Sequence, residues 1–135
     1  MALAVARQGH DVLLTYRSQQ AEAAAVVAEI EALGQRAAAL PLDVGQSESF
    51  DAFASAVRAQ LSAWNRERFD HLVNNAGMGV HAGFAETTRD QFDALVDVHF
   101  KGPFFLTQTL LPLIADGGRI VNISSGLARF ALPGY

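Results

Sequence analysis

The sequence has 135 residues, of which 50% are hydrophobic and 18% are charged, with 10 Lys and Arg against 14 Asp and Glu. This composition predicts one globular domain, residues 1–135, because disordered chains combine low hydrophobicity with high net charge. The net charge of −4 and the scattered basic residues argue against a nucleic-acid partner, and the absence of cysteine excludes disulfides and thiol catalysis. No apolar run reaches the ~18 residues that a membrane span needs. We therefore expect a soluble, cytoplasmic protein with no membrane partner.

Short apolar segments alternate with helical patterns along the chain. Ser18 is predicted to cap the second helix, Gly9 and Gly34 to end the first two, and Thr88 with Gln91 to form a capping box. The predicted helices cover residues 1–8, 18–33, 47–64 and 88–114, the last bending near Pro103, and the predicted strands cover residues 11–16, 36–44, 69–74 and 118–124.

Every path from one predicted strand to the next contains a helix. Such connections produce parallel strands, so we predict an open, doubly wound α/β sheet covered by helices on both faces. Ligands of these sheets bind beyond the carboxyl ends of the strands. The residues at those ends are Arg17, Asp43, residues 74–77, Ser124 and Ser125.

Three segments at strand ends resemble one known family. They are Asn-Asn-Ala-Gly at residues 74–77, Leu-Asp-Val at residues 42–44, and Arg-Ile-Val-Asn-Ile-Ser-Ser at residues 119–125. In this order and over the whole chain they resemble the short-chain dehydrogenase/reductase family. The resemblance implies a Rossmann-type sheet and hydride transfer between a nicotinamide cofactor and a carbonyl or secondary alcohol, as in a 3-oxoacyl reductase. It also implies a homo-oligomer and a chain truncated at both ends, without the N-terminal Gly-rich loop and the C-terminal Tyr-x-x-x-Lys segment.

The resemblance assigns cofactor contacts to six positions. Asn75, Ala76 and Gly77 lie along the cofactor, and Asp43 with Val44 lies beside the adenine. Arg17 favours NADP(H) over NAD(H), because a guanidinium can pair with the 2′-phosphate where NAD enzymes carry an acidic residue. The alternative interpretations are a solvated surface arginine for Arg17, a strand-ending turn for Asp43, and an Asn/Gly turn for residues 74–77.

Ser125 and His99 are the catalytic candidates. Ser125 matches the serine that polarises the substrate carbonyl, although a serine at a strand end also acts as a simple cap. His99 replaces the asparagine that holds a relay water in the family, and its spacing from Phe92 places it on a buried helix face. A core histidine satisfied by a backbone carbonyl is the competing interpretation. Tyr135 follows Ser125 by ten residues, whereas the family motif has about thirteen, so we expect the tyrosine acid to lie beyond Tyr135.

Other classes of site find less support in the sequence. The four histidines have no metal-ligand spacing, and Ser125 lacks the glycines of a hydrolase elbow. The Gly-x-Gly-x-x-Ala match at residues 77–82 does not open a helix, so we do not interpret it as a phosphate loop. The main alternative is a non-catalytic nucleotide-binding module, because no tyrosine–lysine pair is present; a flavodoxin-like domain is less well supported. We expect residues 1–135 by themselves to bind dinucleotide poorly and to be inactive.

Overall fold

The computed structural model describes residues 1–134. The chain divides into two compact units, Met1–Asp43 and Val44–Tyr135. Each unit contains its own pair of parallel strands and the helices that precede or connect them.

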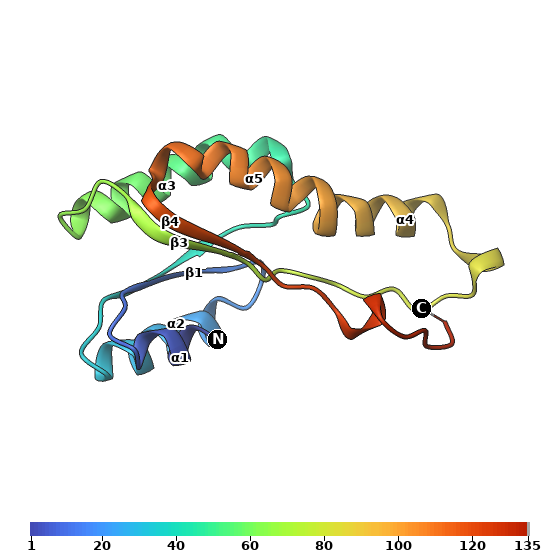
Figure 1. Ribbon diagram of the computed structural model, residues 1–135, viewed down its shortest axis with the longest axis horizontal. Helices are drawn as coiled ribbons and strands as arrows, with labels where there is room; N and C mark the ends of the chain where they lie inside the picture. Colours follow the sequence, from blue (N-terminus) through green and yellow to red (C-terminus); the bar gives the residue numbers. More distant parts are fainter. Residues whose placement is uncertain (135) are drawn as a thin grey trace. The chain divides into compact units, whose positions relative to one another are not determined.

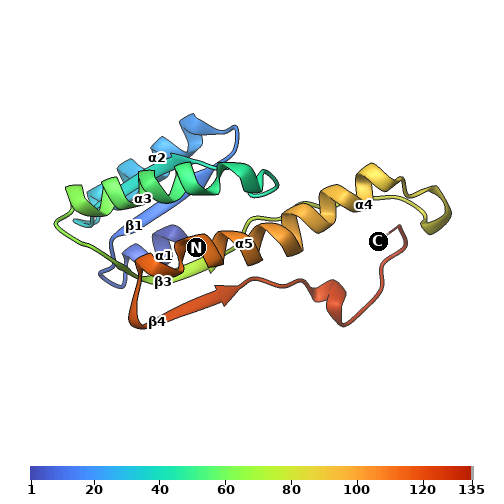
Figure 2. The same ribbon diagram turned by 90° about the horizontal axis from the view of Figure 1, so that it is seen from above.

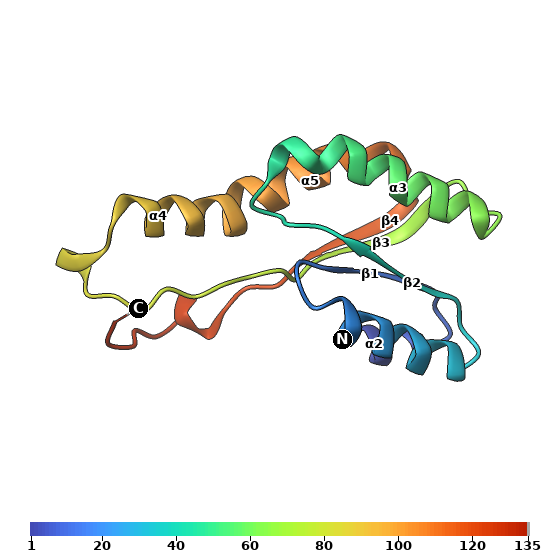
Figure 3. The ribbon, with the colours of Figure 1, turned by 180° about the vertical axis from the view of Figure 1, so that it is seen from behind.

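The first unit is a parallel two-stranded ladder with two helices. Helix α1 (Ala2–Ala6) leads into β1 (Val12–Tyr16), and α2 (Gln20–Ala32) connects β1 to β2 (Ala37–Pro41). Both helices pack against β1, and α2 also packs against α1 and β2, as Figures 1 and 3 show. Asp11 and Arg36 join the starts of the strands, since Arg36 donates from its backbone N–H (2.8 Å) and its Nε (2.9 Å) to the Asp11 carboxylate. This bidentate pair sets the register of the ladder where it begins.

The helix ends of this unit follow the sequence prediction with one exception. Gly9 (φ +88°) and Gly34 (φ +84°) have the left-handed backbone expected of residues that end helices. The prediction that Ser18 caps α2 is wrong, because Gln19 occupies the cap position and makes no side-chain cap hydrogen bond. Ser18 stands one residue too early for its hydroxyl to meet the first free N–H groups of the helix.

The second unit contains the other two strands and most of the helical residues. A 3-10 turn (Ser47–Ser49) leads into α3 (Phe50–Ala63), followed by β3 (Phe69–Asn74) and a second 3-10 turn (Phe84–Glu86). Helix α4 (Arg89–Val96), a π-helical segment (Asp97–Lys101) and α5 (Gly102–Leu110) follow without a break, as Figure 2 shows. The chain then passes through a 3-10 turn (Leu111–Leu113), β4 (Ile114–Asn122) and a last 3-10 turn (Gly126–Ala128). Helices α3 and α5 pack together through buried apolar side chains, among them Phe53, Val57, Leu61, Leu106 and Leu110.

The long helical segment begins as predicted and ends earlier than predicted. Thr88 and Gln91 form the predicted capping box, with the Thr88 N–H donating to Gln91 Oε1 at 2.9 Å and the Gln91 N–H donating to Thr88 Oγ1 at 3.2 Å. The irregularity near Pro103 is the π segment just before it, which accommodates a residue that cannot donate a helical hydrogen bond. Ile114 is not helical, because Pro112 blocks helix propagation and Ile114 pairs with Phe69 as the first residue of β4.

The strand pairing confirms the predicted parallel α/β class but forms two ladders in place of one continuous sheet. Within the described residues, β1 pairs with β2 and β3 pairs with β4. The predicted cover on both faces is incomplete, since Val73, Ile120 and Val121 are each more than a third exposed. A strand with one neighbour in a two-stranded ladder has too few contacts to bury both faces.

Candidate active site

The carboxyl ends of β3 and β4 are joined by a side-chain hydrogen-bond network. Asn74 and Asn122, the last residues of the two strands, are opposite each other in the ladder. The Asn74 amide nitrogen donates to Asn122 Oδ1 at 2.8 Å and to Thr107 Oγ1 of α5 at 3.2 Å. The network holds both strand ends and α5 together, so the segments that follow Asn74 and Asn122 leave the same edge of the ladder. Sequence analysis did not identify Asn122 and Thr107, because no local pattern links positions so far apart.

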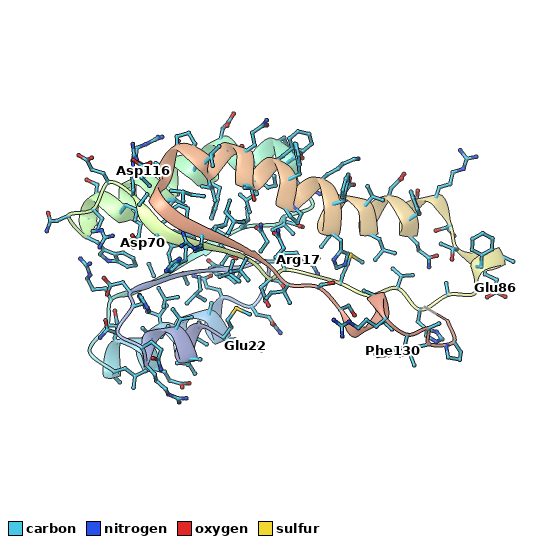
Figure 4. The ribbon with its side chains drawn as sticks, viewed as in Figure 1. Arg17, Glu22, Asp70, Glu86, Asp116 and Phe130 are labelled. Atoms are coloured by element: carbon cyan, nitrogen blue, oxygen red, sulfur yellow. The ribbon has the colours of Figure 1, made fainter. Side chains whose placement is uncertain are left out.

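The opposite end of the ladder carries the charged side chains. Arg66 and Asp70 form an ion pair of 3.0 Å, and Arg68 and Asp116 form one of 3.5 Å. Figure 4 shows Asp70 and Asp116 at this end. The two strands therefore present amides at their carboxyl edge, and the ion-paired charges lie at the other edge, away from Asn74 and Asn122.

Residues 75–77 follow β3 as an exposed segment of small side chains. A side chain at Gly77 would crowd the His99 ring, because an added Cβ would lie 3.0 Å from Cε1 of His99. Glycine at this position therefore permits the imidazole ring to approach the backbone closely. The structure brings Gly77 and His99 together, although they were predicted as separate cofactor-binding and catalytic residues.

His99 lies in the π segment, and its ring contacts the backbone of Met78. The His99 Nε2 atom is 2.7 Å from the Met78 carbonyl oxygen and 3.2 Å from the Met78 backbone nitrogen. The prediction that His99 shares a buried face with Phe92 is wrong, since both side chains are exposed. The π segment changes the helical period between these positions, so spacing alone misplaces the face. The backbone contact is the one that the competing interpretation of His99 expects, whereas the core position that it also expects is not found, because His99 is exposed.

The π segment also carries an ion pair on its outer surface. Lys101 Nζ lies 2.8 Å from Asp97 Oδ1. The hydrogen bond to Asp97 and the negative charge of Asp97 raise the pKa of Lys101 above its usual value. Asp97 and Lys101 are the first and last residues of the π segment, and His99 lies midway between them.

Ser125 follows β4 at the same edge of the ladder as Asn75. Its backbone is extended, it is exposed, and its Oγ accepts a hydrogen bond of 3.2 Å from the Leu127 N–H as the cap of the last 3-10 turn. Ser125 therefore has the capping role that was the structural alternative to a catalytic one. A serine hydroxyl also has one proton to donate, so the cap leaves the Ser125 O–H available to a carbonyl oxygen.

The loop after β3 and the segment after Ser125 meet beyond the ladder, as Figure 1 shows. The Ala82 N–H donates to the Gly134 carbonyl oxygen at 3.0 Å. Gly134 has φ +80°, and an added Cβ there would lie 2.3 Å from the His81 ring. Tyr135, whose role as the acid was considered, lies outside the described residues.

Arg17 and Asp43 lie at the carboxyl edge of the first ladder. Tyr16 is opposite Pro41, and the Leu42 N–H donates to the Tyr16 carbonyl oxygen at 2.8 Å, so the residues after both strands leave the same edge. Asp43 is half-buried, whereas Arg17 is exposed and, among residues 1–134, has no carboxylate within ion-pair distance. Figure 4 shows the side chain of Arg17. An unpaired guanidinium beside a strand end suits a phosphate group. Val44 begins the second unit, where its carbonyl oxygen lies against Gly102.

Two further classes of site are absent from the part of the chain that the structure describes. No three His, Cys, Asp or Glu side chains of residues 1–134 lie close enough to bind one metal ion together. Over the same residues, no helix combines the length and the apolar character that crossing a bilayer requires.

Parallel strands with helical crossovers, and amide, glycine and serine residues at their carboxyl ends, define an α/β protein of the dinucleotide-binding class. The family model described as short chain dehydrogenase matches residues 1–135. The chain therefore belongs to the short-chain dehydrogenase family, and the predicted family and Rossmann-type fold are confirmed.

Known relatives cover almost all of this chain. The 3-oxoacyl-[acyl-carrier-protein] reductase of Synechocystis sp. is 33% identical over 135 residues, covering 98% of this chain and 53% of the relative. The solved structure of the reductase LugOII, which catalyses keto-reduction at C1 during lugdunomycin biosynthesis, has a TM-score of 0.92 at 36% identity, covering 98% of this chain and 54% of that one. The landomycin C-6 ketoreductase LanV, solved with bound NADP and rabelomycin, has a TM-score of 0.90 at 34% identity, covering 98% and 56%. The chain spans about half the length of the curated relatives it matches.

Proposed function

We propose that this protein is an NADP(H)-dependent reductase that transfers hydride between the nicotinamide and a carbonyl or secondary alcohol, of the 3-oxoacyl reductase type. The observation that carries the proposal is the shared edge of β3 and β4, from which residues 75–77 and Ser125 both emerge. The names of the relatives support a ketone as the substrate and NADP as the cofactor.

The residues present suit a nicotinamide dinucleotide. The small side chains of residues 75–77 leave backbone exposed for a flat ligand. Arg17 offers a guanidinium that has no carboxylate of residues 1–134 within ion-pair distance. In this proposal Arg17 binds the 2′-phosphate, Asp43 accepts a hydrogen bond from the adenine amine, and Val44 packs beside the adenine. Ser125 donates a hydrogen bond from its hydroxyl to the substrate oxygen and so stabilises the negative charge that develops there. The bound cofactor supplies the hydride.

An assay of the full-length protein tests this function. NADPH absorbance is followed with a panel of ketones that includes a 3-oxoacyl thioester and a polycyclic aromatic ketone. We expect substrate-dependent oxidation of NADPH. Binding of NADPH without turnover of any ketone would instead favour the non-catalytic nucleotide-binding module, in which Ser125 acts only as the cap of the last 3-10 turn.

Replacing Arg17 with alanine tests the choice of cofactor. Loss of a hydrogen bond to a charged group costs about 1.5–3 kcal/mol, so the KM for NADPH is expected to rise at least about tenfold. The KM for NADH should change little, because NADH has no 2′-phosphate. Arg7→Ala is the matched control, since Arg7 is an exposed arginine of the same unit that does not follow a strand. Equal losses with both cofactors would contradict the assignment.

We also propose that the protein forms a homo-oligomer through α4, the π segment and α5. Phe92, Phe100 and Phe104 lie along this continuous helical segment and are 61%, 73% and 59% exposed. Large apolar side chains gathered along one helical segment are typical of an interface, and a second copy presents the same apolar surface.

Phe104→Asp is expected to weaken this association at least about a hundredfold. Each buried phenylalanine contributes about 1.5–3 kcal/mol, and a two-fold interface contains two copies of it. Analytical ultracentrifugation over a concentration series measures the change. Phe84→Asp is the control, because Phe84 is fully exposed and lies outside these helices. Association that survives Phe104→Asp unchanged would exclude this surface.

A further inference from the structure

We propose that Phe130 is a specificity-determining residue, whose ring lies beside Ser125 and selects ketones that carry a flat aromatic group near the reacting carbonyl. The proposal rests on the proposed function, because that function places the substrate oxygen at Ser125. Two observations carry it: the ring of Phe130 is seated on the backbone of Gly126, and the segments around it are apolar and contain no acidic residue.

Backbone hydrogen bonds fold the segment after β4 back on itself. The Ala128 N–H donates to the Ser125 carbonyl oxygen at 3.1 Å. The N–H groups of Arg129 and Phe130 both donate to the Gly126 carbonyl oxygen, at 2.9 Å and 3.3 Å. The turn therefore returns Phe130 to Gly126, the residue that directly follows Ser125. Figure 4 shows Phe130 in this segment.

Gly126 provides the seat for the aromatic ring. A Cβ added to Gly126 would lie 2.8 Å from Cε1 and 3.0 Å from Cζ of Phe130, so the edge of the ring occupies the space that a side chain would need. Glycine at position 126 therefore permits the ring to approach the backbone closely. The contact covers only part of Phe130, which remains 56% exposed. The ring is thus held at one edge and keeps apolar surface for a ligand.

The segment that carries Phe130 is held at both of its ends. At the start, Ser125 Oγ accepts a hydrogen bond from the Leu127 N–H at 3.2 Å. At the far end, the Gly134 carbonyl oxygen accepts one from the Ala82 N–H of the loop after β3 at 3.0 Å. A side chain on a segment held in this way loses less conformational freedom when a ligand binds than one on an unattached segment does.

The surroundings of Phe130 suit an apolar ligand. Residues 75–83 and 123–134, which leave the carboxyl edge of the second ladder, contain no Asp or Glu, and Arg129 is their only Lys or Arg. Their exposed large apolar side chains are Met78, Ile123, Leu127, Phe130 and Leu132. Exposed apolar side chains gathered at one place are typical of ligand-binding sites. Because these segments are continuous with the edge that presents Ser125, the proposed occupant is the apolar part of the substrate.

The aromatic ring decides which apolar group is preferred. Two aromatic rings gain attraction beyond that of the surface they bury, because their edges and faces carry opposite partial charges. A saturated group of the same size gains only the burial. A ketone fused to a benzene ring is therefore the substrate class that Phe130 favours over its saturated analogue.

Phe130→Leu in the full-length protein tests this preference with β-tetralone and its saturated analogue β-decalone. We expect kcat/KM for β-tetralone to fall by about tenfold, because leucine keeps the apolar character and removes the ring. The value for β-decalone should stay within about threefold of the wild type. Phe84→Leu is the matched control, since Phe84 is fully exposed in the 3-10 turn before α4, and it should leave both values within about threefold. Equal losses for the two ketones in Phe130→Leu would overturn the proposal.

Gly126→Ala tests the seat while the phenylalanine is retained. The added methyl group meets the edge of the Phe130 ring, which can rotate away, so we expect the protein to fold and the preference for β-tetralone over β-decalone to fall as it does in Phe130→Leu. The ratio of the two kcat/KM values is the measure, because a general effect on the neighbouring Ser125 changes both values alike. A Gly126→Ala protein that keeps the wild-type ratio would show that this seat does not position the ring, and would overturn the proposal.

A binding experiment separates the proposal from the proposed function. Fluorine NMR of the full-length protein with para-fluorophenylalanine, in the presence of NADP⁺, needs no turnover, and the signal that disappears in Phe130→Leu belongs to Phe130. We expect β-tetralone to shift this signal more than β-decalone does. If the shift occurs but no ketone is reduced, the proposed function fails and the assignment of Phe130 stands. If ketones are reduced but neither ligand moves the signal, the assignment of Phe130 fails and the proposed function stands.

Discussion

Replacing Gly102 with alanine is expected to lower the free energy of unfolding by about 3 kcal/mol or more. Gly102 is buried at the start of α5, and an added Cβ would lie 2.3 Å from the carbonyl oxygen of Val44 and 2.8 Å from that of Asp97. Both neighbours are backbone atoms, so the clash cannot be relieved by rotating a side chain. Alanine is a better helix former than glycine by about 1 kcal/mol, which is too little to offset this overlap.

Urea denaturation of Gly102→Ala, followed by circular dichroism, measures this loss. Gly83→Ala is the matched control, because an added Cβ at Gly83 meets only the flexible Glu86 side chain, at 3.4 Å. The control is expected to change stability by less than about 0.5 kcal/mol. A Gly102→Ala protein as stable as Gly83→Ala would mean that α5 does not pack against the backbone of Val44 as described.

Replacing Ser125 with alanine is expected to lower kcat of the full-length reductase by about 10²–10³-fold, the effect of removing one donor to a developing oxyanion. The KM for NADPH should stay nearly constant, because the proposed contact of Ser125 is with the substrate oxygen. Ser125 follows β4 at the edge that it shares with residues 75–77, and its hydroxyl proton is free to be donated while Oγ caps the last 3-10 turn.

The loss of the cap in Ser125→Ala must be separated from the loss of catalysis. A missing cap costs about 1 kcal/mol of stability, and a thermal melt measures it. Ser124→Ala is the neighbouring control, since it removes an exposed hydroxyl one residue earlier and should keep activity within about threefold of the wild type. If Ser125→Ala retains full activity while Leu127 loses its cap, Ser125 is structural, and the module interpretation gains support.

The sequence by itself determined the elements whose causes are local. The positions of β1 and β3, the helix-ending residues Gly9 and Gly34, and the capping box of Thr88 and Gln91 were all predicted and are all present. Each of these features depends on residues that are neighbours in the sequence, within a single helical turn or a single strand. The order of helices and strands also predicted parallel pairing, because a helix between two strands brings the second strand back in the same direction. The family resemblance also rested on short local segments, residues 42–44, 74–77 and 119–125.

Tertiary structure decided the contacts that shape the candidate site. Asn74 meets Asn122 across 48 positions and Thr107 across 33, and His99 meets Met78 across 21. The π segment, the strand state of Ile114 and the exposure of Phe92 also differ from what spacing predicts. Hydrophobic periodicity assumes a regular helix and a partner for every apolar face, and neither condition holds in the second unit. The geometry of His99 therefore arises from a helix irregularity and a long-range backbone contact, because a hydrogen bond between distant residues depends on the packing of the elements that carry them.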